Sequence, residues 1–431
     1  MTSRLGPSLP HGWTTPPVYA RYTVQLGKML DEKRIAGTHL APYLRNVDVQ
    51  WNHVNTTDLP EMDFSAEDRE RFSLRSGDLL VCEGGEVGRT ALWDGRLSEC
   101  YFQKAIHRLR PVTENDEPRF FRYFMQLAVH SGLFALFTAS TIQHLPAEKL
   151  RVVRYPSPPR SQQRAIADYL DRETARVDAL VAAKERVLGL LAEKRRALIA
   201  RAVTRGLDPR APLRDSGIPW LGDIPLHWRV VQLKFASISL QTGPFGSQLH
   251  SEDYVTGGTP VVNPSHLSAG RINADDCVAV DEATANRLAL HRLRLGDVVF
   301  ARRGQMGRCG VVEADNVGWL CGTGSLRARL RLDVVDPYYL ALVFAETRIS
   351  DVLTVQSVGS TMDNLNTEIL GSCHVSIPPL TEQRAIVSHI ASETTKLDAM
   401  RAAIQHTIDL LKERRAALIS AAVTGRMQGL S

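Results

Sequence analysis

Residues 302–308 combine three arginines and a glutamine with two glycines in one short loop, Arg302-Arg303-Gly304-Gln305-Met306-Gly307-Arg308. An arginine side chain grips phosphate or pairs with the O6 and N7 atoms of guanine, and a glutamine amide pairs with adenine. Glycines allow a backbone to approach a phosphate closely. The loop is therefore a candidate contact for nucleic acid, although the same composition also suits a solvated hairpin turn.

An earlier loop has the same Gly-x-x-Gly-Arg spacing. The matching residues are Gly85, Gly88 and Arg89 in one loop and Gly304, Gly307 and Arg308 in the other. We call residues 83–89 and 302–308 the first and second glycine loops. The other polar residues of the first loop are acidic, so Glu83 or Glu86 cannot hold a phosphate but could accept a hydrogen bond from cytosine N4. This difference predicts that the two loops select different bases.

Two further pairs of polar segments are candidates with weaker signals. Polar side chains between apolar anchors can face a groove of DNA, and they can equally cap a turn. The first pair precedes the long helices described below. Its residues are Thr141, Gln143 and His144, matched by Thr361, Asp363 and Asn364; those of the second pair are Arg45 and Asn46, matched loosely by Val262 and Asn263.

Motifs for catalysis, nucleotide binding and metal binding are absent from the sequence. There is no G-x-x-x-x-G-K-[ST] string, no H-x-x-x-H spacing and no C-x-x-C pair. Residues 263–266, Asn-Pro-Ser-His, resemble the N-P-P-aromatic motif of adenine methyltransferases, but they lack the second proline and the aromatic ring that would stack on a flipped base. We therefore expect a chain without catalytic activity, metal or cofactor of its own.

Two long predicted helices would position the loops. Residues 158–204 align without a gap on residues 378–424, with 22 of 47 positions identical. Apolar residues recur every seven positions in both copies, which is typical of a coiled coil, although two ordinary amphipathic core helices remain an alternative. We expect Leu180 and Met400 at the intermediate heptad position, and Ser161 and Thr381 as N-caps. The heptad residues are Leu170, Val177, Leu191, Leu198, Ile390, Leu397, Ile404, Leu411 and Leu418.

The blocks between these helices repeat more faintly. The string Leu-Arg-x-Gly-Asp occurs at 74–78 and at 293–297, and an apolar run follows each copy. Short β-branched runs broken by glycine and proline predict strands and hairpins, and residues 120–137 and 338–353 predict helices. Glycines and prolines in residues 206–228 predict a hinge without regular elements. The expected segments are 1–155, 156–207, 208–376 and 377–431.

Composition permits a polyanionic partner without requiring one. The 431 residues are 44% hydrophobic and 23% charged, and 52 basic against 47 acidic residues give a net charge of +5. Outside the two long helices the net charge is slightly negative, so phosphate contacts must come from local clusters or from another subunit. Neither a membrane-spanning run nor a signal-peptide core is present, and we expect a soluble, cytoplasmic protein with reduced cysteines.

The layout resembles the specificity subunit of type I restriction-modification systems over nearly the whole chain. The most specific strings are Pro-Pro-Leu-Thr-Glu-Gln-Arg at 378–384, Arg-Arg-Ala-Ala-Leu-Ile at 414–419 and Gly-Ile-Pro-Trp-Leu-Gly at 217–222. The resemblance implies an α+β fold with two mixed α/β target-recognition domains, separated by two long antiparallel coiled-coil helices in a pseudo-twofold internal repeat. Each domain would read one half of a bipartite, asymmetric target in double-stranded DNA.

The same resemblance implies partners and cofactors. The paired helices would set the spacing between the half-sites and dock two modification (methyltransferase) subunits, and through them the restriction/translocase subunits. S-adenosylmethionine, ATP and Mg²⁺ would belong to those partner subunits. Two other interpretations stay open: a coiled-coil adaptor that binds only protein, and a degenerate adenine methyltransferase.

Overall fold

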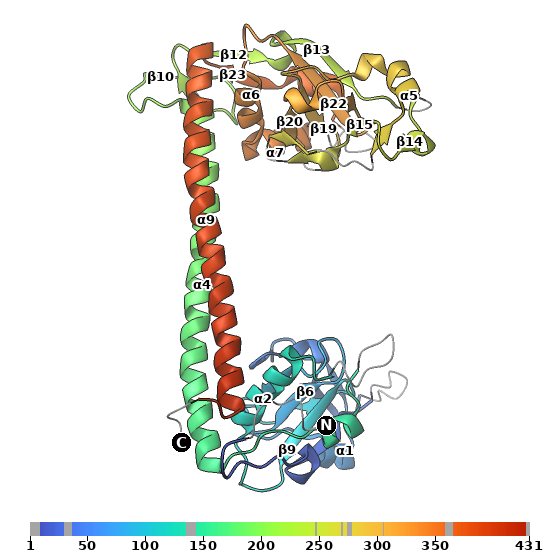
Figure 1. Ribbon diagram of the computed structural model, residues 1–431, viewed down its shortest axis with the longest axis vertical. Helices are drawn as coiled ribbons and strands as arrows, with labels where there is room; N and C mark the ends of the chain where they lie inside the picture. The colour runs from blue at the N-terminus through green and yellow to red at the C-terminus, as the bar shows by residue number, and fades with distance from the viewer. Residues whose placement is uncertain are drawn as a thin grey trace. The chain divides into compact units, whose positions relative to one another are not determined.

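The computed structural model describes residues 9–29, 37–134, 144–245, 248–268, 270–273, 278–304, 306–357 and 365–427. The chain divides into two compact units. Unit 1 comprises residues 1–185 and 405–431, and unit 2 comprises residues 186–404. The two long helices, α4 (Arg160–Arg205) and α9 (Leu380–Val423), each contribute one part to each unit (Figure 1).

Unit 1 is built on a four-stranded antiparallel sheet in the order β1-β9-β6-β7, beside a smaller sheet β5-β2-β8 in which β2 and β8 are parallel. The strands are β1 (Tyr22–Leu26), β2 (Leu40–Leu44), β3 (Val49–Gln50), β4 (His53–Val54), β5 (Glu61–Asp63), β6 (Leu79–Cys82), β7 (Thr90–Leu92), β8 (Tyr101–Phe102) and β9 (Ile106–Pro111). The helices are α1 (Ala66–Phe72), α2 (Pro118–His130) and α3 (Ala147–Val152), with 3-10 turns η2 (Val18–Ala20) and η4 (Asn46–Asp48).

Unit 2 repeats this plan. Its main sheet has the order β13-β22-β19-β20, and a second sheet has the order β14-β18-β15-β21. The strands of these sheets are β13 (Ser237–Thr242), β14 (Tyr254–Val255), β15 (Thr259–Val262), β18 (Ala279–Val280), β19 (Val298–Ala301), β20 (Cys309–Val311), β21 (Leu320–Cys321) and β22 (Ser325–Leu330). Three further pairs are β10 (Leu213–Asp215) with β11 (Asp223–Pro225), β12 (Arg229–Gln232) with β23 (His374–Ile377), and β16 (Leu267–Ser268) with β17 (Arg271–Ile272).

The helices of unit 2 are α5 (Glu282–Arg287), α6 (Pro337–Phe344), α7 (Thr347–Ser357) and α8 (Thr367–Ser372). Its 3-10 turns are η6 (Leu233–Phe235), η8 (Ser251–Asp253), η9 (Pro264–His266), η10 (Ala289–His291) and η11 (Ala314–Asn316).

One of the two inner strands of each main sheet, β6 in unit 1 and β19 in unit 2, is buried on both faces. In β6, Leu79 and Val81 pack on the α2 side, whereas Leu80 and Cys82 pack into the cluster around the smaller sheet. In β19, Val298 and Phe300 pack on the α6 side, whereas Val299 and Ala301 pack into the cluster around the second sheet. Because side chains of a strand point alternately to opposite faces, these short apolar runs become the layer that joins two cores. Each glycine loop follows directly from such a strand.

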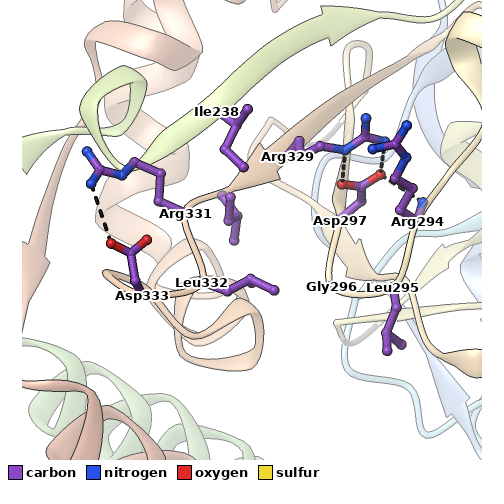
Figure 2. Close-up of a pocket in the computed structure, with 10 residues that line it drawn as sticks. Ile238, Arg294, Leu295, Gly296, Asp297, Arg329, Arg331, Leu332 and Asp333 are labelled. Atoms are coloured by element: carbon purple, nitrogen blue, oxygen red, sulfur yellow. Dashed lines mark hydrogen bonds and ion pairs between the residues drawn. The ribbon is translucent and has the colours of Figure 1, made fainter.

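The Leu-Arg-x-Gly-Asp string directly precedes β6 in unit 1 and β19 in unit 2, and it has a structural role. The carboxylate of Asp78 accepts hydrogen bonds from the Arg75 backbone N–H and from both Nε and Nη2 of Arg110 in β9. Asp297 accepts from the Arg294 backbone N–H and from Nε and Nη2 of Arg329 in β22. Figure 2 shows the pair that Asp297 makes with Arg329. Both aspartates are almost completely buried, so each pair fixes the turn against the neighbouring strand.

The two long helices contact each other within each unit. In unit 1, Arg415 Nε lies 2.8 Å from Asp178 Oδ1. In unit 2, Arg195 Nη1 lies 2.6 Å from Asp398 Oδ1. The repeat relates Asp178 to Asp398 and Arg195 to Arg415, so one ion pair occurs twice. Predicted heptad residues Leu170, Val177, Ile390 and Leu397 are buried, and Leu191, Leu198, Ile404, Leu411 and Leu418 are half-buried.

The expectation for the intermediate heptad position is wrong. Leu180 is 46% exposed and Met400 is 55% exposed. The buried residues at the second seam position lie four residues after a heptad residue rather than three. Thr174 and Ile408, which are buried, occupy such positions. The N-caps also differ: α4 and α9 begin at Arg160 and Leu380, so Ser161 and Thr381 lie inside the first turn.

Two other predicted elements differ from the structure. The helix predicted over 338–353 is divided into α6 and α7, because the chain tightens after Phe344 into short-range bonds such as Glu346 N–H to Val343 O. The hinge contains the β10–β11 ribbon, which its glycines permit: Gly217 and Gly222 adopt φ values of 73° and 65°. The helix predicted over 120–137 is α2, and its predicted end extends into 135–143, outside the described residues.

A tryptophan closes the end of a long helix in each unit. In unit 1, Trp13 donates to Gln162 Oε1 at 3.2 Å and packs beside Gly425, where α9 ends. In unit 2, Trp228 donates to Glu382 Oε1 at 3.1 Å and packs beside Gly206, where α4 ends. Both glycines have positive φ, near 72°. A β-carbon at Gly206 would lie 3.2 Å from Trp228, and one at Gly425 would lie 3.3 Å from Trp13 and 2.5 Å from Pro10. Among the described helices, none is long and apolar enough to cross a membrane.

Candidate nucleic-acid interface

The two glycine loops have equivalent backbone hydrogen bonds. At the start of the loops, Glu83 N–H donates to Ala105 O and Arg302 N–H donates to Gly324 O, each at 2.9 Å. The strand before each loop is closed onto its end, since Cys82 N–H bonds Arg89 O and Ala301 N–H bonds Arg308 O, each at 2.8 Å. The paired glycines all adopt positive φ, between 69° and 83°. The two glycine loops therefore share one backbone conformation but carry different side chains.

In unit 1 the structure brings three of the predicted residues together. Arg89 Nη2 donates to Asn46 O at 3.0 Å, and Asn46 Nδ2 donates to Gly84 O at 2.7 Å. A β-carbon at Gly85 would lie 3.1 Å from Asn46 Nδ2, so the glycine permits this approach. Arg89 and Asn46 therefore support the loop, and their polar groups are largely used internally.

Arg45 and Glu86 also have partners within unit 1. Arg45 makes a bidentate pair with Asp48, with both nitrogen–oxygen distances at 2.9 Å. Glu86 Oε1 accepts from Trp51 Nε1 at 2.6 Å. Trp51 lies at the tip of the β3–β4 hairpin, with its ring centre 6.3 Å from that of His130. The polar surface of unit 1 near its loop is thus an interlinked network of charged and aromatic groups.

In unit 2 the three arginines of the loop differ in their surroundings. Arg302 Nε donates to Leu365 O at 3.0 Å, and burial, followed by the charge of Arg303, lowers the pKa of Arg302. Arg303 is exposed and has no partner among the residues that the structure describes. Arg308 is half-buried, and its Nε has no partner within the same residues. Arg303 is therefore the most accessible cation of the second loop.

Each of the segments before the long helices is hydrogen-bonded to its glycine loop through the backbone of one leucine. Leu145 N–H donates to Glu83 O at 2.8 Å, and Leu365 N–H donates to Arg302 O at 2.9 Å. His144, next to Leu145, is exposed. The other predicted residues of these segments and loops lie outside the described residues: Thr141, Gln143, Gln305, Thr361, Asp363 and Asn364.

The loosely matched segment of unit 2 has a structural position. Val262 is buried in β15, and Asn263 directly precedes the turn η9, where its backbone N–H bonds His266 Nδ1 at 3.2 Å. Burial raises the pKa of Cys82, which precedes the first loop, to about 11, so this thiol is not activated as a nucleophile. No cluster of three possible metal-ligating side chains occurs among the described residues.

Comparison with known proteins identifies the family. The model of the family described as type I restriction modification DNA specificity domain matches residues 26–187 and 234–408. The chain belongs to this family. The type I restriction enzyme EcoKI specificity subunit of Escherichia coli K12 is 24% identical over 97% of this chain and 90% of its own length. The EcoBI specificity subunit of Escherichia coli is 21% identical over 84% of this chain and 76% of its own.

Solved structures share the fold of this specificity-domain protein. A chain from a study of complex assembly and conformational transition of the type I R-M system has a TM-score of 0.77 and 18% identity, covering 98% of this chain and 100% of that chain. The HsdS subunit from Thermoanaerobacter tengcongensis has a TM-score of 0.56 and 17% identity, covering 99% of this chain and 100% of that chain.

Sequence reasoning missed two polar residues of this specificity-domain protein. Gln103 and Lys104 form the turn between β8 and β9, and Lys104 N–H is bonded to Lys28 O at 2.8 Å. Together with Met29, Glu83 and Ala105 they line a shallow cavity of about 350 Å³. The repeat could not reveal them, because residues at the equivalent turn of unit 2 are Gly322 and Thr323. Their signal in the sequence was a polar pair between two short apolar runs.

Proposed function

We propose that this chain is the DNA-specificity subunit of a type I restriction-modification complex, without catalytic activity of its own. One observation carries the proposal: the family model matches the chain twice, and each match contains a glycine loop on the same scaffold with different side chains. Such a pair of modules suits a target with two unlike halves, since identical modules would require a palindrome. Residues 1–155 and 208–376 form the two recognition domains.

The long helices, residues 156–207 and 377–431, form an antiparallel coiled coil in a pseudo-twofold repeat. The doubled ion pair and the line of shielded heptad residues support this pairing. Equivalent faces of the repeat would dock two modification subunits, and restriction subunits would join through them. S-adenosylmethionine, ATP and Mg²⁺ would be bound by those partners. Double-stranded DNA with a bipartite, asymmetric target is the substrate of the whole complex.

We assign the DNA contacts to the two glycine loops and their neighbours. The candidates are Arg45, Asn46, Gly85, Gly88, Arg89, Thr141, Gln143, His144, Arg302, Arg303, Gln305, Arg308, Thr361, Asp363 and Asn364. Of these, Arg45, Asn46, Arg89 and Arg302 have internal partners and would position the loops rather than touch the DNA themselves. Glycines would admit a phosphate to the backbone, exposed cations would neutralise phosphates, and polar side chains would read base edges.

The test is to reconstitute the chain with its modification subunits and to map methylated adenines in DNA. A split motif with one adenine mark in each half is expected. Exchange of residues 226–376 for the matching block of a related subunit should change one half of that motif only. Changes in both halves would contradict separate domains. A complex that binds DNA without sequence preference would favour the adaptor, and S-adenosylmethionine binding by the isolated chain would favour a methyltransferase.

A further inference from the structure

The cavity beside the first glycine loop is held in place by backbone bonds from three segments. Glu83 N–H bonds Ala105 O, Lys104 N–H bonds Lys28 O, and Gly27 N–H bonds Ile106 O at 3.0 Å. Met29, Glu83, Gln103, Lys104 and Ala105 line the space. Because the backbone around it is fixed, the polar side chains at its rim are offered from defined positions.

In unit 2 the position equivalent to Glu83 is an arginine with internal partners. Arg302 is equivalent to Glu83, and Thr323 is equivalent to Lys104, as the bonds to Gly324 O and Ala105 O show. The Arg302 guanidinium reaches Leu365 O at 3.0 Å and Thr323 O at 3.5 Å. It therefore bridges the loop, the β21–β22 turn and the segment before α8. The side chain supports the second loop from within.

This difference between the two units is explained by one residue on the neighbouring strand, β9 in unit 1 and β22 in unit 2. Leu145 O in unit 1 accepts a hydrogen bond from His107 Nε2 at 2.7 Å, and His107 is fully buried in β9. Leu326 takes the place of His107 in β22 and cannot donate. A buried carbonyl needs a donor, so Arg302 supplies it in unit 2. In unit 1 the histidine already does so, and position 83 has no such task.

Three polar side chains are therefore available at the first loop. Among the described residues, the side chains of Glu83, Gln103 and Lys104 have no hydrogen-bond or ion-pair partner. A glutamine amide pairs with adenine N6 and N7, a lysine ammonium donates to guanine O6 or N7, and a carboxylate accepts from cytosine N4. One cavity thus combines the donors and acceptors that base edges require.

We propose that Gln103 and Lys104, beside Glu83, are specificity-determining residues of the first recognition domain, and that they contact base edges of one half of the DNA target. This inference rests on the proposed function. Unit 2 has no equivalent reading position there, because Arg302 fills it as a positioning residue. The two halves of the target are therefore read with side chains from different elements of the same scaffold.

The experiment uses the full chain reconstituted with its modification subunits. Gln103→Leu and Lys104→Met keep side-chain volume but remove the polar ends. Methylated adenines are mapped on a DNA library that varies both half-sites. Each variant should lose about 5- to 150-fold discrimination at one or two base positions of a single half-site. Discrimination in the other half-site should stay at the wild-type level.

Lys149→Met is the matched control, because Lys149 is an exposed lysine on α3 outside the cavity. It should leave both half-sites unchanged. Wild-type discrimination in both cavity variants would overturn the inference, and so would a uniform loss of binding with a smaller salt dependence, which indicates phosphate contact. A wild-type complex without any split motif would instead overturn the proposed function, and the inference with it.

Discussion

At the scale of single residues, neighbouring arginines of the second loop have different tasks. Arg303→Ala should weaken DNA binding similarly for all sequences and lower the slope of log K against log salt by about 0.9, since one phosphate contact is lost. Arg302→Met should instead destabilise unit 2 by about 1–3 kcal/mol, because it leaves the buried Leu365 carbonyl without a donor. Salt titrations and urea unfolding separate the two effects. If both variants changed the salt slope and the stability by similar amounts, the different roles assigned to Arg302 and Arg303 would be contradicted.

His107 couples support of the first loop to pH. Burial lowers the pKa of His107, so the folded protein keeps the imidazole neutral while the unfolded chain takes up a proton below about pH 6.5. Its contribution to stability is complete above that pH and is lost as pH falls toward the lowered pKa of the folded state. We expect wild-type stability to fall more steeply from pH 7 to pH 5 than that of His107→Gln, whose amide can still donate. Urea unfolding at each pH measures this, and parallel curves would refute it.

At the scale of elements, the helix seam predicts which apolar side chains matter. Ile408 is 1% exposed and Met400 is 55% exposed on the same helix. Ile408→Ala should therefore cost about 2–5 kcal/mol in the free energy of unfolding, whereas Met400→Ala should cost under about 0.5 kcal/mol. Chemical denaturation of both variants checks this. A large loss of stability in Met400→Ala, measured on the isolated chain, would show that the second seam position lies three residues after the heptad residue, as the sequence suggested.

The same helices show how far sequence reasoning reaches. Seven-residue spacing identified Leu170, Val177, Ile390 and Leu397 as buried, because a sustained repeat depends on local geometry alone. The choice between three and four residues for the second seam position was wrong, since Leu180 and Met400 are apolar yet exposed. Apolar character alone does not distinguish these positions when half of the second seam positions are Thr or Arg.

The candidate site was predictable only in part, for a similar reason. The glycine loops were found because their spacing is repeated and glycine is required at positive φ. The internal role of Arg302 and the exposure of Lys104 were not, because they depend on His107 in one unit and Leu326 in the other. A substitution on a neighbouring strand decides what a loop residue does, and no local pattern records it.

At the scale of the whole molecule, the first and last described segments pack together in unit 1, at a place that the repeat relates to the hinge in unit 2. Pro10 and Trp13 pack on Gly425 as Trp228 packs on Gly206. Fusing Ser431 to Met1 and opening the chain between Asp208 and Pro209, in an exposed turn, should preserve both units. The permuted chain should assemble with modification subunits and direct methylation of the same motif. Size-exclusion chromatography and methylation mapping test this.

A second permutant, opened after Gly189 inside α4, is the control. It should lose assembly, because the break interrupts the seam rather than a surface turn. Equal loss of assembly in both permutants would show that the continuity of the hinge itself is needed.

The two ways of satisfying one carbonyl also describe a route for change. Leu145 O is held by a strand histidine, and Leu365 O is held by a loop arginine. If Leu326 were first replaced by histidine, the carbonyl would be supported twice and Arg302 would become dispensable. Residue 302 could then be substituted by any polar residue without an unstable intermediate variant. Redundant support, gained before it is needed, would allow a restriction system to acquire a new target while its subunit stays folded.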